Sequence, residues 1–185
     1  MPLTRKEAIR RFVLFGVVSH PALVALACSS VQTVSGAPAG GRLEDVLPKL
    51  QELEKNPSIE AREGFWKPGQ VFSHCAQSVR YARTGFPEMK SALFRSTVGT
   101  IAFGVFSMRD SMSHGITENI PGAEAIDPEL DTRAGLQELI GEIQTFLSYS
   151  GPLQPHFAYG ELSHEQYNRA NTWHIINHWD GLKNT

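Results

Sequence analysis

Apolar residues recur at intervals of three and four in several segments of this chain, and proline or glycine bounds most of these segments. Such spacing places apolar side chains on one face of an α-helix, whereas a half-buried strand requires strict alternation over several residues. No segment alternates for long enough to indicate a strand with confidence. Because amphipathic helices bury their apolar faces against one another, the sequence predicts an all-α domain built as a helical bundle.

Local signals set the ends of these predicted helices. Pro48 and Pro68 fall in first helical turns, where a missing N–H is harmless. Ser163 is followed three residues later by Gln166, which is a capping-box pattern for the start of the last helix. The helices are predicted over residues 44–55, 68–83, 91–109, 128–149 and 163–181.

The N-terminus differs in composition from the rest of the chain. Residues 5–11 are mostly basic, and residues 12–27 are almost wholly apolar or small. This order is typical of a secretory signal, and the apolar run is too short for a convincing transmembrane helix. Ala25-Leu26-Ala27 is a small-residue cleavage pattern. We therefore predict a signal peptide over residues 1–27, with a retained amphipathic helix as the alternative.

Cys28 follows the cleavage pattern directly, which resembles a bacterial lipoprotein signal in which this cysteine is lipidated. Arg10-Arg11-Phe12 also resembles a twin-arginine export signal. Either signal predicts an exported protein, periplasmic or anchored as a lipoprotein in a bacterial cell envelope. Ser, Gly, Ala and Pro dominate residues 28–42, which we interpret as a flexible tether to a domain over residues 43–185.

Composition and charge exclude some classes of function. The formal net charge is -2 in 185 residues, so no basic surface indicates nucleic-acid binding. The hydrophobic content of 41% is ordinary for a globular domain. If Cys28 is lipidated, Cys75 has no partner for an internal disulfide. We therefore expect no nucleic-acid partner, and membrane contact only through an N-terminal lipid anchor.

Two histidines, His174 and His178, lie one helical turn apart in the last predicted helix. This spacing places both imidazoles on one face, within reach of a single ion. Tyr167 and Asn171 share their stripe, which borders the apolar stripe of the same helix. A polar stripe at the edge of the core is a place where a metal ion or a ligand can be held between helices.

A metal ion with open positions needs at least one more protein ligand, and the second predicted helix offers His74. From the residues alone, a metal site and ordinary core histidines are equal alternatives. The candidate metal ligands are His74, His174 and His178. The candidates for orienting them or for lining a pocket are Gln70, Gln77, Asn171 and Tyr167.

Three further residues could contribute to such a site but have simpler interpretations. Cys75 adjoins His74 yet points about 100° away on a helix, which is more typical of a small buried residue. His114 and His156 fall in predicted loops, where a histidine more often belongs to a turn or to the surface.

Residues 66–78 resemble the second-helix motif of the DinB-like superfamily, and the late His-x-x-x-His pair about a hundred residues further on matches its second motif. The order is the same, with one histidine on an early helix and two on the last. The phrases at residues 84–87 and 155–160 resemble an uncharacterised branch of this superfamily. The resemblance covers roughly residues 43–181.

This resemblance implies a four-helix bundle with an up-down-down-up arrangement and an additional short helix or long loops. It implies a divalent metal ion, nickel or zinc, on the three histidines. The function implied is a metal-dependent thiol transferase or hydrolase acting on an unidentified small molecule. The alternative is a non-catalytic binding or assembly module that retains only the fold. Relatives often form homodimers, so the resemblance also implies a second copy as a partner.

Overall fold

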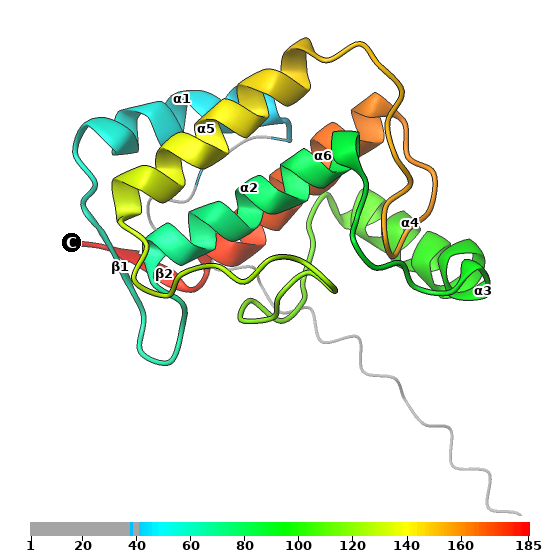
Figure 1. The fold of residues 1–185 in the computed structure, drawn as a ribbon, viewed down its shortest axis with the longest axis horizontal. Helices are drawn as coiled ribbons and strands as arrows, with labels where there is room; N and C mark the ends of the chain where they lie inside the picture. The colour runs from blue at the N-terminus through cyan, green and yellow to red at the C-terminus, as the bar shows by residue number, and fades with distance from the viewer. Residues whose placement is uncertain (1–37, 39–40) are drawn as a thin grey trace, which may run out of the picture. The chain divides into compact units, whose positions relative to one another are not determined.

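The computed structural model describes residue 38 and residues 41–185 (Figure 1). The described part of the chain is mostly helical, which confirms the all-α class. The predicted signal peptide, Cys28 and most of the tether lie outside the described residues. The helices are α1 (Leu43–Lys55), α2 (Pro68–Thr84), α3 (Ala92–Phe94), the π-helical turn η1 (Arg95–Gly99), α4 (Thr100–Arg109), α5 (Thr132–Ser148) and α6 (His164–Trp179).

The core lies among α1, α2, α5 and α6, which run side by side in Figure 1. Helix α2 packs against both α5 and α6, and α1 packs against the same two helices. Each helix contributes the apolar face that its spacing predicts, so burial follows the helical period. The fully buried apolar side chains include Leu43, Leu50, Phe72, Leu136, Leu139, Ile143, Phe146 and Ile175.

Two glycines allow α2 and α5 to approach each other at backbone distance. A Cβ atom placed on Gly135 would lie 2.3 Å from the carbonyl oxygen of Gly69. A Cβ atom on Gly69 would lie 2.0 Å from the carbonyl oxygen of Leu130. Because neither position has room for a side chain, the two glycines fix the start of α2 against the start of α5.

Ion pairs continue this contact along the outer side of α2. The Arg80 guanidinium binds the carboxylates of Glu138 at 2.7 Å and of Glu142 at 2.8 Å. Arg83 pairs with Glu142. The Ser73 hydroxyl donates to Glu138 at 2.6 Å. These bonds hold α2 in one rotational setting about its axis, and that setting directs its other polar residues toward α6.

A small two-stranded sheet closes one end of the domain. Strand β1 (Ile59–Ala61) pairs antiparallel with β2 (Leu182–Asn184), with Glu60 opposite Lys183. The sequence predicted no strand here because three residues are too few for alternation to be visible. Helix α6 therefore ends at Trp179, two residues before its predicted end, because the chain turns at Gly181 to enter β2.

Helix α5 begins at Thr132, four residues after its predicted start at 128. Asp131 caps it, since its carboxylate accepts hydrogen bonds from the backbone N–H groups of Arg133 and Ala134. The earlier Asp127 instead closes a turn by accepting from the N–H of Glu129. Both aspartates can accept hydrogen bonds at the start of a helix. Only Asp131 directly precedes the helix whose apolar side chains are buried in the core.

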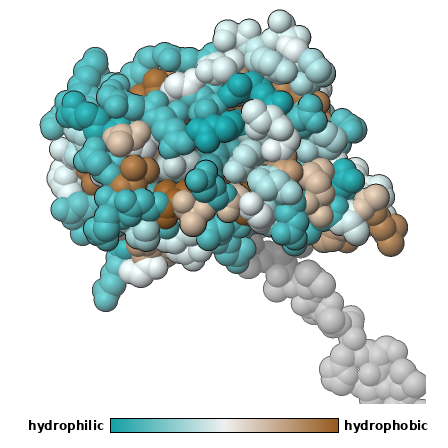
Figure 2. Space-filling view, viewed as in Figure 1, coloured by the Kyte–Doolittle hydropathy of each residue, from teal (hydrophilic) through white to brown (hydrophobic). Residues whose placement is uncertain are grey.

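The predicted helix over residues 91–109 forms as α3, η1 and α4 in direct succession, set to one side of the main helices in Figure 1. Although this segment is rich in apolar residues, only Gly99 is buried. Figure 2 shows hydrophobic surface at this end of the molecule. Its most exposed apolar side chains are Leu93, Val98, Ile101 and Met108. Among the described residues, no helix is both long enough and apolar enough to cross a membrane.

Candidate metal centre

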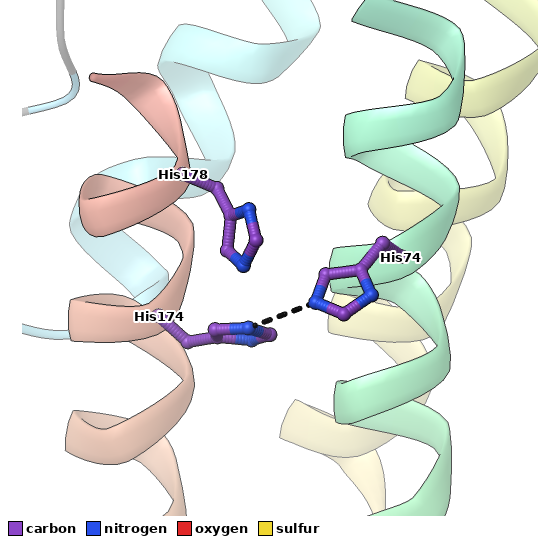
Figure 3. A group of neighbouring side chains, drawn as sticks. All are labelled: His74, His174 and His178. Atoms are coloured by element: carbon purple, nitrogen blue, oxygen red, sulfur yellow. Dashed lines mark hydrogen bonds between the residues drawn. The ribbon is translucent and has the colours of Figure 1, made fainter. Parts of the chain in front are cut away.

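Helices α2 and α6 bring three histidines to one point inside the domain (Figure 3). His74 comes from the middle of α2, and His174 and His178 lie one turn apart on α6. All three are buried, with exposed fractions of 2%, 9% and 0%. The structure therefore brings together the three residues that we predicted from the sequence as candidate metal ligands.

The nitrogen atoms of these rings converge at metal-binding distances. His74 Nε2 and His174 Nε2 lie 3.2 Å apart, and one nitrogen from each ring falls within 4.8 Å of the others. Two nitrogens that are each about 2.0–2.1 Å from a zinc ion are separated by about 2.9–3.4 Å for angles between octahedral and tetrahedral. The His74–His174 distance lies in this range, and the third ring has a nitrogen within 4.8 Å of both, so the three histidines can hold a metal ion.

Unpaired nitrogens distinguish this cluster from ordinary core histidines. His74 Nδ1 and both ring nitrogens of His178 are buried without a hydrogen-bond partner in the described structure. A buried polar atom without a partner costs about 1–3 kcal/mol. Histidines kept only for packing would be expected to satisfy these atoms, whereas a metal ion would satisfy the nitrogens that face it. The donor set of three imidazoles therefore fits a divalent ion of the zinc and nickel group.

The environment keeps the cluster uncharged, as metal ligation requires. Burial, reinforced by the charge of His114, lowers the pKa of His74 to about 4. Burial and the neighbouring histidines lower the pKa of His178 to about 2 and that of His174 well below its ordinary value. The Ile116 backbone raises the pKa of His178, but this effect is smaller than that of burial. It forms no hydrogen bond with either ring nitrogen. All three imidazoles are neutral near pH 7.

Trp66, from the loop before α2, covers one side of the cluster. Its ring meets His74 edge-on at 5.3 Å and stacks over His178 at 6.5 Å between centroids. The apolar indole lowers the local polarity on this side, which strengthens electrostatic interactions at the site.

His114 is exposed and lies in a loop, as its sequence pattern predicts, and it also lies beside the cluster. Its ring centroid is 5.1 Å from that of His174 and 5.2 Å from that of His178. His114 Nδ1 lies 2.7 Å from the Gly115 carbonyl oxygen, which fixes the proton on Nδ1 and leaves a lone pair on Nε2. Asn177 holds this loop by donating to the His114 carbonyl. Loop geometry, which the sequence does not reveal, makes His114 part of the site.

A cavity of about 240 Å³ opens beside the cluster. His74 and His174 form part of its wall, and loop residues from three other segments complete it. The cavity gives a small molecule access to His74 and His174. Its polar lining includes Ser78, His114, His156 and Asn171.

Three of the four residues predicted to orient the ligands or to line a pocket form hydrogen bonds elsewhere. The Gln77 side chain donates to the Glu124 carbonyl, and the Tyr167 hydroxyl donates to the Gln154 carbonyl. Asn171 accepts from the Ser78 hydroxyl at 3.2 Å. Gln70 is half-buried. Among the described residues, none of the four makes a hydrogen bond to the three histidines, although Asn171 lines the cavity.

Cys75 is buried, as predicted for a small residue on this helix, and burial raises the pKa of its thiol.

The fold and the site together define a helical domain with a buried three-histidine cluster that can hold a metal ion. The chain belongs to the family described as Protein of unknown function (DUF1569), whose match covers residues 41–185. The match confirms the prediction that the chain belongs to an uncharacterised domain family. No curated protein and no solved structure matches the chain.

Proposed function

We propose that this protein binds a divalent metal ion, zinc or nickel, through His74, His174 and His178. The convergence of three buried imidazoles with unpaired nitrogens carries this proposal. Three neutral nitrogen ligands leave positions open on a four- to six-coordinate ion, and the cavity beside His74 and His174 supplies access to them. The site is therefore built for reaction or exchange at the metal more than for a purely structural ion.

The arrangement of helices supports a DinB-like bundle made of α1, α2, α5 and α6. Contacts join α2 and α1 to both α5 and α6, and the histidines occur in the order that this superfamily shows. In this interpretation α3, η1, α4 and the two short strands are additions to the bundle.

The chemistry we propose is that of a metal-dependent thiol transferase or hydrolase acting on a small molecule. A divalent ion supplies a site for a thiolate, or polarises a carbonyl group. The chain contributes the cavity, the apolar Trp66 ring that covers one side of the cluster, and His114, whose Nε2 lone pair can accept a proton or a hydrogen bond beside the cluster.

Metal analysis of the purified chain tests this proposal. We expect about one zinc or nickel ion per chain after chelation and reloading, and a cobalt-substituted form with visible absorption bands typical of nitrogen ligands. Absence of stoichiometric metal under these conditions would leave only the alternative, a binding or assembly module that retains the fold without a metal.

We also propose export, with a lipid anchor at Cys28, on the sequence of residues 1–28. A bacterial host expressing the chain should place it in the membrane fraction, and Cys28→Ala should release it or block its processing. Unchanged membrane attachment and processing in Cys28→Ala would contradict the lipid anchor. Replacement of Arg10 and Arg11 by lysine separates the twin-arginine route from the general secretory route.

A further inference from the structure

The loop over residues 155–160 places His156 on the wall of the cavity. His156 and Gly160 exchange two backbone hydrogen bonds of 2.7 and 3.1 Å, and Gly160 adopts a φ of 79° that favours glycine. The Phe157 carbonyl accepts from the Lys90 N–H. A Cβ atom on Gly99 would lie 1.8 Å from the Ala158 carbonyl oxygen, so η1 supports the loop at backbone contact.

This loop also fixes the tautomer of the His156 ring. Nδ1 lies 3.1 Å from the backbone nitrogen of Ala158 and 3.2 Å from that of Tyr159. Because both backbone groups are donors, Nδ1 must accept and the proton must reside on Nε2. The ring stacks on Tyr159 at 4.2 Å with planes 7° apart, and it contacts Phe86 at 4.8 Å. His156 is therefore an oriented, neutral N–H donor.

The cavity wall holds two donors without acceptors. His156 is 8% exposed and lines the cavity, and no hydrogen bond of its Nε2 occurs among the described residues. Asn171 is 3% exposed and lines the same cavity, and its Nδ2 is buried without a partner. Lys90 and Glu118 also line the cavity and balance each other in charge. The part of the wall formed by His156 and Asn171 thus offers two donors, which suit an acceptor oxygen, whereas the free lone pair of His114 lies beside the histidine cluster.

Helix α6 sets the spacing between these donors and the three histidines. The His156 ring contacts the Tyr167 ring at 6.0 Å, and Tyr167, Asn171 and His174 follow one another at near-turn intervals. Since a helix rises about 1.5 Å per residue, Asn171 and His174 are only about 4.5 Å apart along the axis. A molecule of a few carbon atoms can therefore reach from Asn171 to the histidines.

We propose that His156 Nε2–H and Asn171 Nδ2 form a carboxylate-binding subsite of this cavity. The ligand class is a small molecule with a carboxylate at one end and a metal-binding oxygen or sulfur group at the other. Only the metal-binding end of this ligand rests on the proposed metal function. The carboxylate end does not depend on it. Both donors of the subsite are neutral N–H groups. They bind the carboxylate through hydrogen bonds to its charged oxygens, without a cationic side chain.

A pair of hydroxamates tests the subsite on the zinc-loaded full chain. Succinate monohydroxamate carries both groups, and its isostere with an isopropyl group in place of the carboxylate carries only the metal-binding group. Calorimetric titration should show tighter binding of the carboxylate compound. In His156→Asn its affinity should fall about ten- to a hundredfold, as for loss of a hydrogen bond to a charged group, while the isostere should be unaffected.

Two substitutions separate ligand binding from support of the loop. In His156→Asn the side-chain oxygen can still accept from the Ala158 and Tyr159 amides, but the donor at Nε2 is lost. In His156→Gln the amide can replace the Nε2 donor, but the acceptor at Nδ1 is lost. We expect His156→Gln to bind succinate monohydroxamate within about threefold of the unsubstituted chain, since it keeps one hydrogen bond. The reverse order, with His156→Asn binding normally, would show a purely structural role and overturn the proposal. His164→Asn, on the exposed start of α6, is the matched control.

Nitrogen-15 NMR of the unsubstituted chain reads the subsite without any variant. The His156 ring should show a protonated Nε2 and an unprotonated Nδ1, and bound succinate monohydroxamate should shift the Nε2–H signal. A bound ligand that leaves this signal unmoved would contradict the subsite. If the chain takes up no zinc, the metal function fails by that measurement alone. Succinate titrated into the metal-free chain then decides the subsite by the same NMR signal.

Discussion

His74 Nε2 and His174 Nε2 lie 3.2 Å apart, although one hundred residues separate them in the chain. Their helices meet along a face that also carries His178, both of whose ring nitrogens are unpaired within the described part of the chain. Removal of one ring should therefore damage the whole site. We expect His74→Ala and His178→Ala to weaken zinc binding by about a hundredfold or more, since loss of an orienting partner alone costs about 10- to 100-fold.

Competition with a chromophoric chelator measures this zinc affinity. His164→Ala is the control, because His164 belongs to the same helix but stacks on Phe146, away from the cluster. Equal zinc affinity in His178→Ala and in the control would rule out His178 as a ligand.

Acid should destabilise the metal-free chain through its buried histidines. Burial lowers the pKa of His156 from 6.5 to about 3, so this ring stays neutral in the folded state after it has become protonated in the unfolded state. The unfolded state therefore binds more protons below pH 6.5, and the free energy of unfolding falls by about 1.4 kcal/mol per pH unit for each such histidine. The stability is complete above pH 6.5 and is lost as the pH decreases toward 3.

Urea unfolding between pH 7.5 and pH 5, as approximate limits, measures this dependence. His156→Asn removes one titrating group, so its free energy of unfolding should vary less steeply with pH than that of the unsubstituted chain. Identical slopes in both chains would mean that His156 is accessible to protons in the folded state.

The contact between Gly69 and Gly135 makes a prediction about packing. In Gly135→Ala the new methyl group would meet the Gly69 carbonyl oxygen at 2.3 Å, so α2 and α5 must separate. We expect a loss of about 1–3 kcal/mol in the free energy of unfolding, which is typical of overpacking. Because α2 carries His74, zinc affinity should fall as well.

Gly141→Ala is the matched control on the same helix. A Cβ atom at Gly141 has no neighbour within 4 Å, so the substitution should stabilise α5 by about 0.5–1 kcal/mol through helix propensity. Thermal unfolding of the two variants should therefore shift in opposite directions, and a parallel shift would contradict the close approach of the two helices.

The ion pairs between α2 and α5 should contribute to stability because they are partly shielded. Glu142 is paired with Arg80 and Arg83, and its side chain is 17% exposed. Glu142→Gln removes the charge that both guanidinium groups share, and we expect a loss of about 1–3 kcal/mol. Glu52→Gln is the control, since the Glu52–Lys55 pair is solvent-exposed and should be without measurable effect. Chemical denaturation of both variants at low and high salt distinguishes the two kinds of pair.

Much of the local structure was predictable from sequence because it depends on neighbouring residues. The ranges of α1, α2 and the α3–α4 segment agree with their apolar spacing and with their proline and glycine boundaries. The Ser163 and Gln166 capping box forms as expected. Where the prediction was wrong, as at the start of α5, two equally good capping residues competed and only tertiary packing selected one of them.

The sequence by itself determined that His174 and His178 share one helical face, because a period of 3.6 residues is a local property of the backbone. Only the tertiary structure decided which residues meet that face. Packing of α2 against α6 brought His74 to it, and two loops without any periodic signal brought His114 and His156 to the cavity. Contacts between distant segments depend on the fit of whole surfaces, which no local pattern of residues encodes.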